Sequence, residues 1–246
     1  MKRYRWLVVT AAILVALSAS VYGIHYLVFH DAKHIFIYLV GDIAFVPIEV
    51  LLVVVVIERL LARQERRSLL KKTNMLIGTF FGELGTELLG ILTAGVANKD
   101  EVRPMIAVCK DWRPQDYRKA LEFVRSFDFS FDTGALDLAA LRDYLVSKRN
   151  FLVLLLANPN LLEHDRFTDL LWAVTHLQEE LAARDSLDDL PATDAKHLGG
   201  DIKRVYAQLT AEWLHYCRHL QAAYPYIFSI IMRTHPLQES PCATVA

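Results

Sequence analysis

Two carboxylates lie within an apolar stretch near the start of the chain, where ionisable groups are costly and are usually kept for a function. Asp42 and Glu49 are seven residues apart, so a helix places both on one face. We expect an intramembrane polar cluster in which Asp42 lies near three side chains of the preceding apolar stretch: Tyr22, His25 and Tyr26. Such a cluster would either hold helices together by hydrogen bonds or conduct protons or cations.

A second set of candidate ligands lies near the C-terminal end of the chain. Glu212, His215 and His219 share one face of a helix, and the first two have the spacing used in di-iron bundles. A di-iron site needs a second such pair and two more glutamates, and the sequence has no second copy. It offers only loose alternatives: Glu163, His164, His176 and Glu179. The two histidines alone indicate zinc only weakly, because the glutamate of the protease motif is missing. We therefore expect solvated or core-edge histidines here, with no metal and no cofactor.

The elements that must position these residues begin with two apolar runs. Residues 6–29 and 35–57 are each long enough to cross a bilayer, which takes about 20 residues. Only five residues separate the runs, so the sequence predicts a tight antiparallel transmembrane hairpin over residues 1–58. A cleavable signal peptide is the competing interpretation, but the first run continues past the small residues at 18–20.

Positive charge is concentrated around the hairpin. The first 72 residues hold ten Lys/Arg and five Asp/Glu, whereas the remainder holds 17 and 23. The positive-inside rule then predicts a two-pass protein of the cell inner membrane with cytoplasmic N- and C-termini. Six basic residues after the second run set this topology and are candidates for contact with lipid headgroups. They are Arg59, Arg63, Arg66, Arg67, Lys71 and Lys72.

A basic juxtamembrane helix and an amphipathic helix are expected over residues 59–97. In the amphipathic part, residues 74–97, small side chains recur on one stripe that would let another helix approach closely: Gly78, Gly82 and Gly90. Apolar residues recur every four positions on another face. The pattern leaves open whether this helix is interfacial, re-entrant or packed on the following domain.

The sequence predicts a cytoplasmic helical domain over residues 98–235. The residues 135–157 are expected to form its buried central helix, because the last turns are apolar on all sides. From residue 202 the apolar positions step by four and three, which is typical of a coiled coil or of a bundle helix, and we favour the bundle. Residues 236–246 are predicted to form a disordered tail. The predicted fold is all-α, a two-helix transmembrane hairpin followed by a cytoplasmic α-helical bundle.

The motifs of several enzyme classes are missing. The sequence contains no phosphate-binding glycine loop, nucleophile elbow or kinase signature. Its acidic C-terminal part has no aromatic and basic stripe, which argues against nucleic acid as a partner. We expect a membrane-anchored interaction or scaffold module rather than an enzyme, with the lipid bilayer and either a second copy or another protein as partners. An oligomeric ion- or proton-conducting channel or transporter subunit is the first alternative, and a metal-dependent bundle enzyme is the second.

Overall fold

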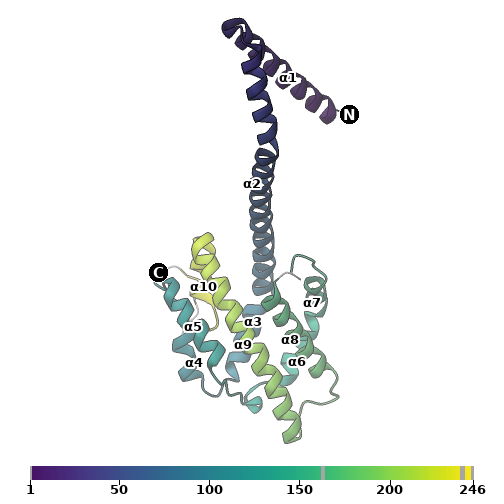
Figure 1. The fold of residues 1–246 in the computed structure, drawn as a ribbon. Coiled ribbons are helices and arrows are strands. Elements are labelled where there is room, and N and C mark those ends of the chain that lie inside the picture. The colour runs from purple at the N-terminus through teal and green to yellow at the C-terminus, as the bar shows by residue number, and fades with distance from the viewer. Residues whose placement is uncertain (1, 162–163, 239–241, 245–246) are drawn as a thin grey trace. The chain divides into compact units, whose positions relative to one another are not determined.

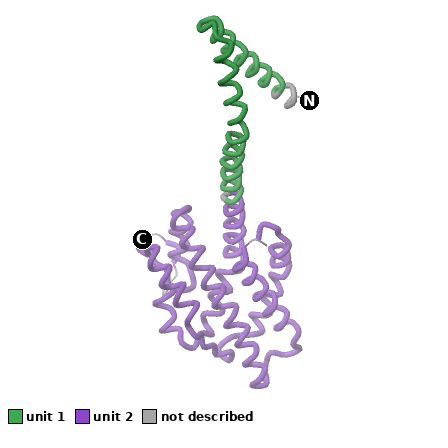
Figure 2. Tube along the Cα trace, in the orientation of Figure 1, with its two compact units in different colours: residues 1–66 green, residues 67–246 purple. Residues whose placement is uncertain are grey.

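The described chain is helical and falls into two compact units. The computed structural model describes residues 2–161, 164–238 and 242–244. Within these ranges there is no strand, only an isolated antiparallel bridge between Val96 and Phe131. The units comprise residues 1–66 and 67–246 (Figure 2). The prediction of an all-α protein is confirmed.

The first unit contains α1 (Lys2–Phe29) and the N-terminal part of α2 (Ala32–Phe80). Both helices are long and apolar enough to cross a membrane by length and composition. The chain reverses at His30, whose φ of 52° lies in the left-handed region. Asp31 Oδ1 then accepts a hydrogen bond from the backbone N–H of His34 at 3.1 Å, which satisfies a free donor in the first turn of α2.

The expected close packing of the two apolar helices is not found. The rings of His25 and His34 stack 6.0 Å apart at the turn, and beyond it the helices diverge (Figure 1). The short connection between the two apolar runs correctly predicted that the chain reverses there. A short connection does not by itself make α1 pack against α2. The first helix is apolar on all sides, so its sequence favours no one face for packing against α2.

The second unit is built from ten shorter elements and the C-terminal end of α2 (Figure 1). They are η1 (Phe81–Gly85), α3 (Thr86–Ala94), α4 (Lys99–Ile106), α5 (Pro114–Ser126), η2 (Thr133–Ala135), α6 (Leu138–Ser147), α7 (Arg149–Leu156), α8 (Asp165–Ala182), α9 (Ala192–Ala223) and α10 (Pro225–Thr234). Proline begins α5 and α10 at a position where its missing N–H is not needed.

The amphipathic segment 74–97 lies in the core of this unit. Phe80, Leu84 and Leu88 are each 0% exposed, as the four-residue repeat predicted, and a π-helical turn at η1 buries Phe81 as well. Thr86 Oγ1 donates to the carbonyl of Phe81 at 2.7 Å, which pairs an acceptor within the altered turn. The compact unit therefore begins at residue 67, whereas the sequence placed the start of the domain at residue 98.

The long helix α9 is the centre of the second unit and packs against α3, α5, α8 and α10. Its apolar face is buried inside the same chain, since Tyr206, Leu209 and Trp213 are each 0% exposed. The bundle interpretation of this face is confirmed. The expected central helix over 135–157 is wrong: it breaks at Lys148 into α6 and α7, and Leu154 is 71% exposed because α7 lies at the edge of the unit.

The prediction of a disordered tail is also wrong for its described residues. Leu237 is buried, and its carbonyl accepts a hydrogen bond from Arg103 Nε at 3.0 Å. Pro236 lies against Gly90 of α3. These contacts hold Pro236 against α3 and Leu237 against α4, so this part of the tail packs on the second unit. Residues 239–241 and 245–246 of the predicted tail lie outside the described residues.

Two glycines of η1 provide a matched test of this packing. A Cβ at Gly85 would lie 2.6 Å from the Phe80 ring and 2.7 Å from the Phe81 ring, whereas a Cβ at Gly82 meets no described atom within 4 Å. Gly85→Ala should lower the free energy of unfolding by about 1–3 kcal/mol, as overpacking does. Gly82→Ala should be neutral or stabilising by up to about 1 kcal/mol. Thermal unfolding of the full-length variants in detergent, followed by circular dichroism, measures both, and equal midpoints would contradict this packing.

Candidate functional site

The predicted intramembrane cluster is not assembled within one chain. Asp42 and Glu49 are exposed on α2 and make no hydrogen bond or ion pair with any described side chain. Tyr22 and Tyr26 are 38% and 50% exposed on α1, and His25 packs on the rings of the turn. The predicted cluster would form only if α1 packed along α2. These helices diverge from the turn that joins them, so they do not pack in this way (Figure 1).

The predicted headgroup contacts are exposed along α2. Arg59, Arg63, Arg66, Lys71 and Lys72 are all solvent accessible, as a contact with phosphate groups would require. The side chain of Arg67, predicted with them, lies outside the described residues.

The glycine stripe does not form one helix contact. Gly78 lies against the Tyr216 ring at 3.7 Å, and Gly90 lies against Pro236, whereas Gly82 is exposed. The π-helical turn adds a residue between the first and last glycine, so the four-residue spacing no longer keeps them on one face. Gly78 lines a groove of about 540 Å³ between α2, α9 and α10, together with Met75.

The predicted ligands near the end of α9 surround an arginine. Glu212 is 3% exposed, and its Oε1 lies 3.5 Å from Arg166 Nε of α8. Arg166 Nη1 lies 2.7 Å from His215 Nε2, and since a guanidinium only donates, the imidazole accepts. His219 is turned toward Asn74 of α2, with 3.5 Å between Nδ1 and Nδ2. A cation already lies between the first two groups, which disfavours a metal ion there.

Burial controls the protonation of this cluster. It raises the pKa of Glu212 above the ordinary value, and the guanidinium of Arg166 opposes that shift without cancelling it. Burial, with a contribution from Arg166, lowers the pKa of His215 to about 4. The imidazole is therefore neutral at physiological pH, consistent with its role as an acceptor.

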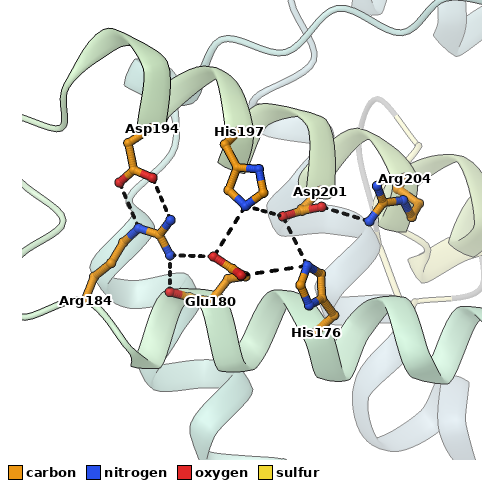
Figure 3. A network of polar contacts seen from close by, with 7 residues as sticks. All are labelled: His176, Glu180, Arg184, Asp194, His197, Asp201 and Arg204. Atoms are coloured by element: carbon orange, nitrogen blue, oxygen red, sulfur yellow. Dashed lines mark hydrogen bonds and ion pairs between the residues drawn. The ribbon is translucent and has the colours of Figure 1, made fainter.

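The structure brings together a different set of titratable groups, between α8 and α9, which the sequence analysis missed (Figure 3). His176 and Glu180 come from α8, and His197 and Asp201 come from α9. Ligand atoms of Glu180, His197 and Asp201 all lie within 4.8 Å of one another. Each helix contributes a histidine followed four residues later by a carboxylate, and this repeated spacing is the pattern that the sequence offered.

Two arginines hold the carboxylates of this α8–α9 cluster. Arg184 Nη1 donates to Glu180 Oε2 at 2.9 Å, and its other nitrogens bind Asp194 in a bidentate pair at 2.6 and 2.9 Å. Arg204 Nη1 donates to Asp201 Oδ1 at 2.8 Å. The hydrogen bond from Arg184 holds the pKa of Glu180 and of Asp194 below the ordinary values.

The buried carboxyl of Glu212 should make stability depend on pH. Folding raises the pKa of this carboxyl, so between its pKa in the unfolded chain and its higher pKa in the folded protein, only the folded protein keeps the proton. The free energy of unfolding therefore falls as pH rises through this range. Glu212→Gln cannot titrate, and its stability relative to wild type should rise with pH by about 1.4 kcal/mol for each unit of raised pKa. Urea unfolding at about pH 5 and about pH 8 measures the difference.

Glu179 is the control for this measurement. It is exposed on α8, next to Glu180 of the α8–α9 cluster. Glu179→Gln should change stability equally at both pH values. A difference between Glu212→Gln and wild type that does not vary with pH would contradict the burial of an ionisable carboxyl at this position.

Most of the chain is similar to a protein of known sequence. It is 40% identical over 232 residues, covering 94% of this chain and 93% of the relative, to a protein of Methanocaldococcus jannaschii described as "Uncharacterized protein MJ1433". Residues 2–61 match the family model described as the MJ1433 N-terminal helical domain, and residues 69–233 match the C-terminal helical domain. No solved structure matches the chain. The chain belongs to the MJ1433 family, whose two domains correspond closely to its two compact units.

Proposed function

We propose that this protein is a membrane-anchored helical interaction module. The observation that carries the proposal is the composition of the two units. Residues 1–66 present apolar side chains to their surroundings, whereas residues 67–246 bury theirs in a continuous core. Apolar helices of this length that are not covered by protein are stable in a bilayer. The corresponding division of the family into two helical domains supports separate roles for the two units.

The distribution of charge supports one orientation in the membrane. Basic side chains follow the second apolar run along α2, and the connection His30–His34 contains a single lysine. The positive-inside rule then favours a cytoplasmic location for residues 67–246. Exposed arginines and lysines near the membrane surface would each add about 1 kcal/mol of attraction to anionic lipids.

The surface of the second unit supports an interaction role. Large apolar side chains on several helices are more than half exposed, including Met75 at 71%, Leu154 at 71%, Trp172 at 60% and Tyr226 at 73%. Exposed aromatic and methionine side chains are enriched at protein interfaces. We therefore assign the second unit the task of binding protein, either a second copy or another chain.

Removal of the first unit should release the protein from membranes. Full-length protein should remain in the membrane fraction after high-salt and alkaline washes, because its attachment is apolar, whereas residues 67–246 alone should be recovered in the soluble fraction. Extraction of the full-length chain by salt alone would indicate a peripheral, electrostatic attachment and would refute the anchor.

Native cysteines report the orientation. Cys109 and Cys242 are exposed in the second unit and Cys217 is buried. A membrane-impermeant maleimide should label the first two in inverted vesicles and none of the three in sealed right-side-out vesicles. A Cys109→Ser, Cys242→Ser variant is the control and should react only after denaturation. Labelling in right-side-out vesicles would place the second unit outside the cytoplasm.

Native mass spectrometry in mild detergent tests the interaction role. One chain has a mass of 28.1 kDa, and we expect a complex of higher mass that contains either several copies or a second protein. The same complex should form after Asp42→Asn and Glu49→Gln, because neither carboxylate contacts another described side chain. A monomer with no bound protein would refute the proposal.

A further inference from the structure

We propose that the α8–α9 cluster binds one divalent metal ion of the zinc type through four side chains: His176, Glu180, His197 and Asp201. This inference concerns a site within the second unit and is independent of the proposed membrane anchoring. Three features of the cluster support a bound ion: the arrangement of the ligands, one unpaired buried oxygen and the groups that hold the carboxylates in place.

The two helices present matching pairs of ligands. Residues four apart lie on one face of a helix, so His176 and Glu180 project together from α8, and His197 and Asp201 project together from α9. The two faces meet, as the ring nitrogens and carboxylates converge on a common space (Figure 3). Metal sites in helical bundles are built in this way, from side chains on facing helices.

The separations fit a shared ion better than direct hydrogen bonds. His197 Nε2 lies 3.5 Å from both Glu180 Oε2 and Asp201 Oδ2, and His176 Nε2 lies 3.5 Å from Asp201 Oδ2 and 3.9 Å from Glu180 Oε1. A good N–H···O hydrogen bond is about 2.7–3.2 Å long. Ligands at about 2.0–2.2 Å from a tetrahedral zinc ion are separated from each other by about 3.3–3.6 Å. Three of the four separations match this range, and the 3.9 Å between His176 Nε2 and Glu180 Oε1 is longer.

Asp201 supplies an independent indication of a ligand. Its side chain is 5% exposed, and Oδ2 has no hydrogen-bond partner among the described residues although it is buried. Leaving a buried carboxylate oxygen unpaired is unfavourable, so a partner is expected. Since Arg204 Nη1 already holds Oδ1 at 2.8 Å, Oδ2 is directed toward the two imidazoles, where the proposed ion lies.

The surrounding arginines orient the ligands without occupying the site. Arg204 is bound to the outer oxygen of Asp201. Arg184 is bound to Asp194 and to Glu180 Oε2, the oxygen that also faces His197, while Glu180 Oε1 faces His176. Outer groups that hold the ligands of a metal in this manner tune its affinity. The site of Glu212 and His215 differs, because there Arg166 itself lies between the carboxylate and the imidazole.

The donor set determines the class of metal. Two imidazoles with two carboxylates suit zinc and neighbouring transition metals, whereas calcium and magnesium prefer oxygen ligands alone. Glu180, His197 and Asp201 bring their ligand atoms within 4.8 Å of one another. His176 Nε2, 3.5 Å from Asp201 Oδ2, would close the shell as the fourth ligand, and four protein ligands are typical of a structural rather than a catalytic site. Both imidazoles are about half exposed, at 45% and 52%, so an ion can enter from solvent. Bound there, it would fasten α8 to α9 across residues 183–191.

Zinc titration of the full-length protein tests the proposal. Protein purified in detergent is stripped with a chelator and titrated with Zn²⁺ in competition with a chromophoric chelator. We expect one Zn²⁺ per chain, and a loss of affinity of at least about 100-fold in His176→Ala and in His197→Ala, because even outer-sphere changes cost about 10–100-fold. Both histidines are exposed enough that the variants should fold, which circular dichroism checks.

Two control variants lie outside the cluster. Glu179→Gln removes an adjacent exposed carboxylate on α8, and His219→Ala removes a histidine of α9 that faces Asn74. Both should bind Zn²⁺ as the wild type does, and Co²⁺ should give the visible spectrum of a tetrahedral site in all but the two ligand variants. Absence of stoichiometric zinc in the wild type would overturn the proposal, and so would wild-type affinity in His176→Ala and His197→Ala. Loss of binding in His219→Ala would place the site elsewhere.

Discussion

Burial of two consecutive phenylalanines at the end of α2 is the constraint on which the second unit depends. Phe80 packs edge-on against Phe167 of α8 at 5.1 Å, and Phe81 packs edge-on against Trp213 of α9 at 5.4 Å. Consecutive residues of an α-helix point about 100° apart, so burying both rings requires α8 and α9 to enclose the end of α2 from two sides. The π-helical turn that begins at Phe81 accommodates this arrangement.

The enclosing pair of helices then carries the polar groups of the unit. The inner face of α9 buries mostly apolar and aromatic side chains around Tyr206 and Trp213, with Thr210 buried among them. Charged side chains of α9 lie along the contact with α8. One end of that contact holds Glu212 with Arg166, and the other holds Asp201 with two histidines. The chemistry of the unit is therefore a consequence of how α8 and α9 are placed by their shared apolar core.

The two polar clusters contain the same residue types but differ in where their arginines lie. Arg166 lies between a carboxylate and an imidazole, which keeps Glu212 paired, and burial, with a contribution from Arg166, lowers the pKa of His215 to about 4. Arg204 instead contacts the outer oxygen of Asp201, and Arg184 approaches Glu180 Oε2 from the side of Asp194. A cation in the centre excludes a metal ion, whereas cations at the edge leave the central space to one.

The sequence by itself determined the elements and their inward faces, because helical periodicity and apolar length are local properties. The two long apolar helices, the buried repeat ending at Leu88 and the apolar face of α9 all followed from spacing alone. Tertiary structure decided which residues meet. The π-helical turn separated Gly78 from Gly90, and α1 and α2 diverge beyond the turn that joins them. The α8–α9 contact joined residues that no single helix relates. Those outcomes depend on distances between helices, which periodicity along one helix does not contain.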